Sequence, residues 1–348
     1  MLVLGMDVGK RELYACLQQG STSSPAILGR RGPVANTAGG WAQLTTWVEK
    51  QAKGDTVHMV MGATNVYWER PAHHFHFRRV SFQVSVVTPA QIKCFALLVL
   101  RRGKTAAMDA EIIAWYGLVM QSAVWTPLAQ VRTELKQLTR ERETVLARRT
   151  QENNHLIALK DMEHASLLAL SLPQGRLELL QRQVDEIEAA LNVLVQQDAH
   201  LAQQLKLLLS VPGFALILAI TAIAETEGFA QLTTGKEISA AVGMVPAPQQ
   251  SGACQGRGRI FKTGNARLRR MAYLSALGAS KSHSRLRTYD RSLRETGKPA
   301  KVALIALVRK RLCTELAVVR SGKPYDDAFL RPHGGAGPTS PQDLTPAR

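Results

Sequence analysis

Short apolar runs alternate with helical patterns over the first third of the chain. The runs cover residues 2–7, 57–63 and 83–87. Helical patterns lie between and after them, most clearly over residues 108–117. Because strands that alternate with helices pack as layers, residues 1–125 are predicted to form an α/β domain with a mixed or parallel sheet.

Aliphatic residues at three-four spacing mark the next part of the chain, residues 126–208. The stripe consists of Leu177, Leu180, Val184, Ile187, Leu191 and Leu194, and continues through Leu201, Leu205 and Leu208. An earlier helix runs through Val131, Leu135 and Leu138, and we expect the break between the two helices at residues 172–175, Leu-Pro-Gln-Gly. The pattern predicts an antiparallel helical hairpin or coiled-coil arm. A bundle packed on itself and an arm used for dimerisation account for it equally well.

Residues 209–330 are predicted to form a mostly α-helical domain with glycine-rich loops. The most apolar run of the chain, residues 207–224, is interrupted by a Pro-Gly pair and stops at Glu225, which favours two buried helices over a membrane span. The turn between these helices fits either a phosphate-binding turn or a plain connection. Residues 331–348 are rich in Pro, Gly, Ser and Thr and are predicted to be a disordered tail.

Positive charge is concentrated in the C-terminal region. The chain has a formal net charge of +17, and residues 251–325 contain 18 Lys and Arg against 3 Asp and Glu. A short basic run is usually a solvated surface, but this bias persists over a long segment that otherwise has the composition of a folded domain. Because neutralised phosphates release condensed counterions, the segment predicts binding to a polyanion, in particular a nucleic acid.

The spacing of the cysteines indicates the redox state of the compartment in which the protein works. Cys16, Cys94, Cys254 and Cys313 are far apart and form no CxxC pair. This usage is typical of a reducing compartment and argues against a disulfide framework and a zinc knuckle. The first apolar stretch is too short and too soon acidic for a signal peptide. We therefore expect a cytoplasmic protein with no place in a membrane.

Asp7 and Ser251 are the candidates for chemistry that the residues themselves indicate. Asp7 ends an apolar strand at the sheet edge where ligands collect in open α/β sheets, although a surface turn explains it as well. Ser251 lies in a glycine-rich loop, with Arg257, Arg259 and Lys262 close in sequence. A serine that attacks a phosphodiester needs a base or a metal to take its proton and cations to stabilise the phosphoryl oxygens. This loop supplies cations but no base.

Longer blocks of sequence occur along almost the whole chain, about residues 3–328. The N-terminal blocks are GMDVGK, ATNVYWE, VSVVTPAQIKCFA and RRGKTAAMDAEIIA. The C-terminal blocks are VPGF, AAVGMVP, QQSGACQGRGRIFKTGNARLRRMAY and GKPAKVALIALVRKRL. In this order and spacing they resemble the insertion-sequence-110 family of transposases, which includes the Piv-type DNA invertases. The first set looks like the family's RuvC-like domain and the second like its serine-bearing transposase domain.

The resemblance implies a DNA transposase or site-specific recombinase of a mobile insertion sequence. Donor and target are DNA, a structured RNA guides the protein, and the chain assembles as a homodimer or homotetramer. A DEDD carboxylate set binds divalent metal, here Mg²⁺, and a serine attacks DNA and holds it covalently. Carried over by position, Asp7 is the first carboxylate, Asp109 the fourth and Ser251 the nucleophile. Phosphate contacts are expected from Arg257, Arg259, Lys262, Arg269 and Arg270.

The chain departs from the family pattern at two of the four carboxylates, where Gly62 and Ala106 stand. Because paired divalent cations need several oxygen ligands, we expect Asp7 and Asp109 to bind one Mg²⁺ weakly rather than a pair. The hypothesis is a protein that keeps the fold and the nucleic-acid surface and has reduced or no strand-transfer activity. The alternatives are a catalytically dead DNA- or RNA-binding remnant of a transposase, and a RuvC-type nuclease that uses metal alone.

Overall fold

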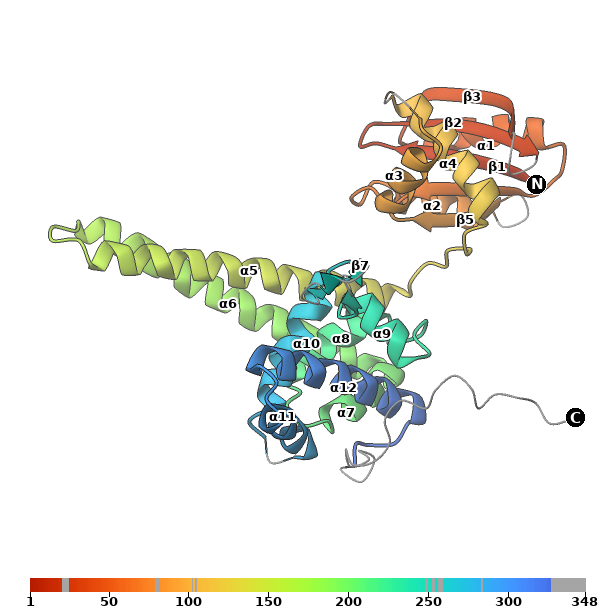
Figure 1. Ribbon diagram of the computed structural model, residues 1–348. Coiled ribbons are helices and arrows are strands. Elements are labelled where there is room, and N and C mark those ends of the chain that lie inside the picture. Colours follow the sequence, from red (N-terminus) through yellow and green to blue (C-terminus); the bar gives the residue numbers. More distant parts are fainter. Residues whose placement is uncertain are drawn as a thin grey trace, which may run out of the picture. The chain divides into compact units, whose positions relative to one another are not determined.

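The computed structural model describes residues 1–20, 25–78, 82–101, 103, 105–247, 250–251, 254–255, 259–282 and 284–326. The chain divides into two compact units, Met1–Pro127 and Leu128–Arg348 (Figure 1). Each unit has buried apolar clusters of its own. The expected disordered tail, residues 331–348, lies outside the described residues.

The first unit is built on one mixed sheet of five strands in the order β3-β2-β1-β4-β5. The strands are β1 Leu2–Val8, β2 Glu12–Gly20, β3 Pro25–Ala35, β4 Val57–Gly62 and β5 Phe82–Val87. β2 pairs antiparallel with β1 and β3, whereas β1, β4 and β5 are parallel. The predicted α/β layer with a mixed sheet is confirmed. β2 and β3 have no counterpart among the predicted strands; most of β3 is exposed, so it shows no apolar alternation.

Helices cover both faces of this sheet. They are α1 Ala38–Ala52, α2 Glu69–His76, α3 Pro89–Leu98 and α4 Ala106–Met120. α1 and α2 pack with Leu2, Leu4 and Met6 of β1, whereas α3 and α4 share a cluster with Val3. Because neighbouring strand residues point to opposite faces, the two helix pairs lie on opposite sides of the sheet.

The second unit is mostly helical, as predicted. Its helices are α5 Gln130–Lys160, α6 Leu167–Gln197, α7 Ala199–Leu209, α8 Leu216–Thr226, α9 Gly235–Val242, α10 Ala266–Ala279, α11 Arg285–Glu295 and α12 Ala300–Ser321. Between α9 and α10, β6 Pro246–Ala247 pairs with β9 Arg259–Ile260, and β7 Gln250–Ser251 pairs with β8 Cys254–Gln255. The main core gathers residues of α8, α10 and α12 with parts of α5, α6 and α7.

α5 and α6 lie side by side as a long helical hairpin (Figure 1). The predicted hairpin is confirmed, but its predicted break is wrong, because residues 172–175 are helical and residues 161–166 separate the two helices. Pro173 lies inside α6. A proline removes one intrahelical hydrogen bond, and the helix continues through this position with Pro173 buried. The description of the hairpin as a coiled-coil arm stays a prediction.

The apolar run at residues 207–224 is divided between two helices, the end of α7 and most of α8. The predicted pair of buried helices is therefore confirmed. Within the described ranges, every helix is too short or too polar to cross a membrane.

Candidate functional site

The close packing of α4 on β1 determines which end of the helix lies next to which end of the strand. A Cβ at Gly5 would overlap the backbone of Ala110 and Ala114, and a Cβ at Gly117 would come within 2.7 Å of the Val3 side chain. Val3 therefore lies against the later turns of α4 and Gly5 against the earlier ones. Because the strand and the helix run in opposite directions, the carboxyl end of β1 meets the amino end of α4.

Asp7 and Asp109 lie at this meeting point. Side chains alternate along a strand, so Asp7 is on the same face as Val3 and Gly5, the face that α4 covers. Asp109 is in the first turn of α4, one residue before Ala110. Both aspartates are half-buried. The structure thus places these two candidate residues at one end of one unit.

The two positions that lack a carboxylate lie at the same end. The parallel register of β1 and β4 pairs Met6 with Met61. One further step along both strands leads to Asp7 and Gly62. Ala106 is the first residue of α4. A Cβ at Gly62 would lie 3.6 Å from Oγ1 of Thr64, which is an ordinary contact, so this position has room for a larger side chain.

The set of metal-ligating groups at this end is small. Within the described part of the chain, no group of three or more His, Cys, Asp or Glu is arranged to hold a metal. Asp7 and Asp109 together supply fewer carboxylate oxygens than a pair of divalent cations needs. Glu111, also on α4, binds elsewhere, since its carboxylate bonds Arg30 Nε at 2.6 Å and Arg101 Nη2 at 2.7 Å.

Ser251 lies in the small two-stranded ribbons of the second unit. In β7 it pairs with Cys254 of β8. This inner ribbon lies, along the chain, between the strands of the outer ribbon β6–β9. Ser251 is therefore carried on one loop that leaves α9 and returns to α10. Arg257, in the same loop, lies outside the described residues, and for Arg259 the structure gives the strand alone.

Three predicted phosphate-contacting residues have described side chains. Lys262 and Arg270 are exposed. Arg269 is half-buried, and its Nη1 donates to the carbonyl oxygens of Val242 at 3.1 Å and Lys262 at 3.0 Å. Arg269 therefore connects α10 to the end of α9 and to the loop that precedes α10.

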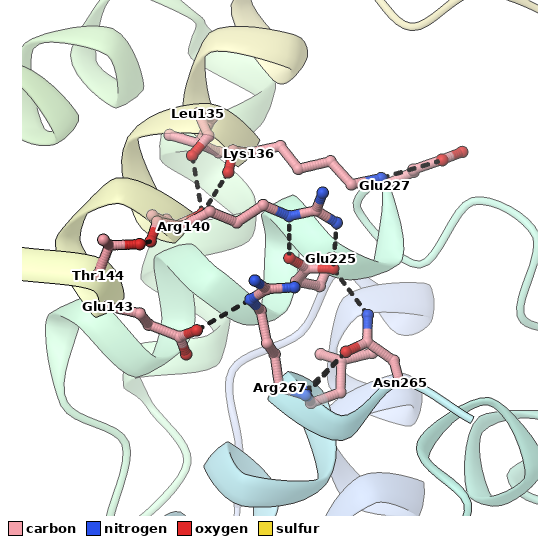
Figure 2. A network of polar contacts seen from close by, with 11 residues as sticks. Leu135, Lys136, Arg140, Glu143, Thr144, Glu225, Glu227, Asn265 and Arg267 are labelled. Atoms are coloured by element: carbon pink, nitrogen blue, oxygen red, sulfur yellow. Dashed lines mark hydrogen bonds and ion pairs between the residues drawn. The ribbon is translucent and has the colours of Figure 1, made fainter. Parts of the chain in front are cut away.

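A buried carboxylate, which no sequence motif indicated, positions the basic segment. Glu225 at the end of α8 has a side chain only 1% exposed. Arg140 donates to both of its oxygens, at 2.9 and 3.1 Å, and Asn265 Nδ2 donates at 2.7 Å (Figure 2). Asn265 in turn caps α10, since its Oδ1 accepts from the backbone N–H groups of Arg267 and Leu268. Glu225 thus connects α5, α8 and the start of α10.

The surroundings of Glu225 keep it ionised. Burial raises its pKa, but the hydrogen bonds from Arg140 and Asn265 outweigh burial and hold the pKa below its usual value. An ion pair between Arg267 Nε and Glu143 Oε2, at 2.9 Å, joins α10 to α5 as well (Figure 2). The amino end of α10, which follows the Ser251 loop, is therefore held by charged groups of two other helices.

The turn between α7 and α8 surrounds a buried arginine. Arg311 of α12 donates through Nη1 to the carbonyl oxygens of Pro212 and Ser275, and lies 4.7 Å from the ring centroid of Phe214. Glu315 pairs with it at 3.2 Å. Burial lowers the pKa of Arg311 and raises the pKa of Glu315, although their mutual attraction acts against both shifts. The turn anchors α12, which favours a plain connection over a phosphate-binding turn.

Two family models match the chain. A DEDD transposase model, described as Transposase, matches residues 4–164. A second model, described as Transposase IS116/IS110/IS902 family, matches residues 205–291. The matches include Asp7, Asp109 and Ser251.

Similar proteins include DNA-inverting proteins and insertion-element proteins. The pilin gene-inverting proteins of Moraxella bovis and Moraxella lacunata are 25% and 24% identical over 333 residues, which cover 93% of this chain and 97% of each relative. The insertion element IS900 uncharacterized 42 kDa protein of Mycobacterium paratuberculosis is 33% identical over 124 residues, 35% of this chain and 31% of that relative.

Proposed function

Because the chain belongs to the insertion-sequence-110 family of transposases, we propose that it is a site-specific DNA recombinase that cuts and rejoins DNA. The observation that carries the proposal is the similarity to gene-inverting proteins over 93% of the chain, through both units. The concentration of positive charge in residues 251–325 supports it, since DNA is the polyanion on which such an enzyme acts.

Ser251 supplies the nucleophile in this proposal. Its hydroxyl oxygen attacks a DNA phosphorus, its proton passes to a base, and the cut strand leaves as a hydroxyl end. Arg257, Arg259, Lys262 and Arg270 would neutralise the phosphates around the attacked one. Arg269 would act as a positioning residue for this segment, as its two bonds to backbone carbonyl oxygens support.

The first unit would be a RuvC-like domain with a reduced metal site. The convergence of positions 7, 62, 106 and 109 at one end of the sheet supports this proposal. Asp7 and Asp109 would hold one Mg²⁺, which when bound supplies a Lewis acid for a phosphate oxygen. Because two positions lack carboxylates, we propose weak metal binding and slow strand transfer.

The proposed partners besides DNA are a structured guide RNA, which rests on family membership, and further copies of the chain. Apolar side chains near the end of the α5–α6 hairpin support contact between copies. Ile157, Met162, Leu167, Leu168 and Leu172 are 50% to 85% exposed. Large exposed apolar patches are typical of protein contacts. Leu168→Ser should therefore weaken self-association, so that the chain sediments at a lower mass than a homodimer or homotetramer.

A recombination assay on DNA that carries the ends of the element tests the proposed function. The unaltered chain should recombine slowly, Ser251→Ala should not recombine, and Gly62→Glu combined with Ala106→Asp should recombine faster. Equal rates for the unaltered and restored chains would show that the reduced-site hypothesis is wrong.

The same assay separates the alternatives. If neither the unaltered nor the restored chain cuts DNA while both still bind it, the protein is a non-catalytic remnant. If Ser251→Ala cuts as fast as the unaltered chain, cleavage is that of a metal-dependent nuclease.

A further inference from the structure

An open apolar groove lies beside the basic segment of the second unit. Its volume is about 290 Å³, and its walls come from α10, from α12, from β9 and from the residues that follow α9. The residues that decide its chemistry are Met244, Ile260, Arg270, Tyr273, Leu274 and Ile305.

The groove is suited to a flat apolar group. Met244 is only 2% exposed, whereas Tyr273 and Leu274 are 38% and 46% exposed. The tyrosine therefore offers part of an aromatic ring to an incoming group, and aliphatic side chains complete the surface. A planar ring fits such a wall better than a sugar or a phosphate, since neither of those can replace its lost water there.

The rim of the groove carries positive charge without compensation. Arg270 is exposed and has no ion pair or hydrogen bond with the described residues. A neighbouring cavity of about 420 Å³ also borders Arg270 and Leu274, but its further charges are paired. There Arg142 binds Glu188, and Glu143 binds Arg267. Arg270 thus places an anion-binding side chain beside the apolar wall of the groove.

We propose that this groove binds one unstacked nucleobase of a DNA strand, with the base on Tyr273 and the adjoining phosphate on Arg270. A nucleotide presents a planar apolar ring beside an anion, which matches this combination of wall and rim. The proposal rests on the proposed function, because it requires that the chain acts on DNA. The groove includes β9, the strand on which the Ser251 loop returns, so a captured base would fix the position of the strand relative to that loop.

A binding experiment with abasic DNA tests the groove. Two single-stranded oligonucleotides of equal length and charge are compared, one with bases and one with a central abasic stretch. The unaltered chain should bind the strand with bases about tenfold more tightly. Tyr273→Ala should remove this preference, and Arg270→Gln should weaken binding to both strands.

Two matched variants serve as controls. Leu277→Ala alters a side chain of α10 that is 38% exposed, like Tyr273, but does not border the groove. Lys281→Gln removes an exposed charge that follows α10. Leu277→Ala should keep the preference for bases, and Lys281→Gln should keep it too. An RNA strand of the same sequence tests whether the groove binds a base of RNA instead. In that case the RNA strand binds more tightly than the DNA strand, and Tyr273→Ala removes this difference.

The outcomes separate the groove from the proposed function. Equal affinities of the unaltered chain for the two DNA strands would overturn the groove proposal, and so would a preference that survives in Tyr273→Ala with an unchanged melting temperature. Either result leaves DNA recombination standing. A chain that binds neither DNA nor RNA would contradict the proposed function itself.

Discussion

At the scale of single residues, Glu225 shows what a sequence conceals. Its position indicates only that an acidic residue closes an apolar run. Its partners are 85 and 40 residues away along the chain, in Arg140 and Asn265. No local spacing connects these three residues, so the network was not predicted. Asp7 was a candidate because it ends an apolar strand, and Asp109 because a family motif marks it; the structure adds that both lie at one end of the sheet.

Replacement of Glu225 by glutamine should destabilise the second unit by about 2 kcal/mol, because the charge-assisted hydrogen bonds between its buried carboxylate and Arg140 are lost. The measurement is urea unfolding followed by circular dichroism. Glu295→Gln is the control, since the Arg291–Glu295 pair is exposed on both sides and is expected to contribute less than about 0.5 kcal/mol. Equal effects of the two substitutions would contradict the assigned role of Glu225.

The pH dependence of this contribution has a definite sign. The pKa of Glu225 is lowered in the folded protein from the ordinary value of 4.5. Its stabilisation is therefore fully present above that value and is lost as the pH falls through the folded pKa. The difference in unfolding free energy between the unaltered chain and Glu225→Gln should be constant near neutral pH and shrink in acid. A difference that grows as the pH falls would contradict the direction of the shift.

At the scale of elements, the contact between α4 and β1 brings positions 7, 62, 106 and 109 together. We expect Gly5→Ala to destabilise the first unit by roughly 3 kcal/mol, because overpacking forces two backbones apart. Gly39→Ala in α1 is the control, since a Cβ there meets nothing within 4 Å. Thermal unfolding measures both. If Gly5→Ala melts like Gly39→Ala, the close contact does not exist.

The elements also show where sequence patterns succeed and fail. β1, β4 and β5 are apolar runs and were predicted to within one residue at each end, in keeping with strands buried on both faces. β3 is mostly exposed and gave no pattern. In the α5–α6 hairpin, Pro173 and Gly175 indicated a break, but packing in α6 overrides this local preference.

At the scale of the whole molecule, charge is divided unevenly. Residues 151–200, from the end of α5 through α6, contain 3 Lys and Arg against 8 Asp and Glu, the reverse of the basic residues 251–325. Nucleic acid should therefore contact the basic region in preference to α6. This division was readable from the sequence, whereas the paired state of Arg267, Arg294 and Arg311 was not.

The salt dependence of DNA binding should distinguish free from paired arginines. Each phosphate contact that is lost lowers the slope of log affinity against log salt by about 0.9 for duplex DNA. Arg270→Gln should reduce the slope by about that amount. Arg291→Gln, which removes a side chain paired with Glu295, should change it less. Filter binding over a range of salt concentrations measures both slopes. Equal slopes for Arg270→Gln and Arg291→Gln would show that Arg270 does not contact a phosphate.

The proposed function requires that Ser251 becomes covalently attached to DNA. The direct measurement is to incubate the chain with radiolabelled DNA that carries the ends of the element and Mg²⁺, and to separate the products on a denaturing gel. We expect a labelled protein–DNA adduct, more of it when Gly62→Glu and Ala106→Asp are introduced, and none with Ser251→Ala. Cleaved DNA without any adduct, or an adduct that persists in Ser251→Ala, would contradict it.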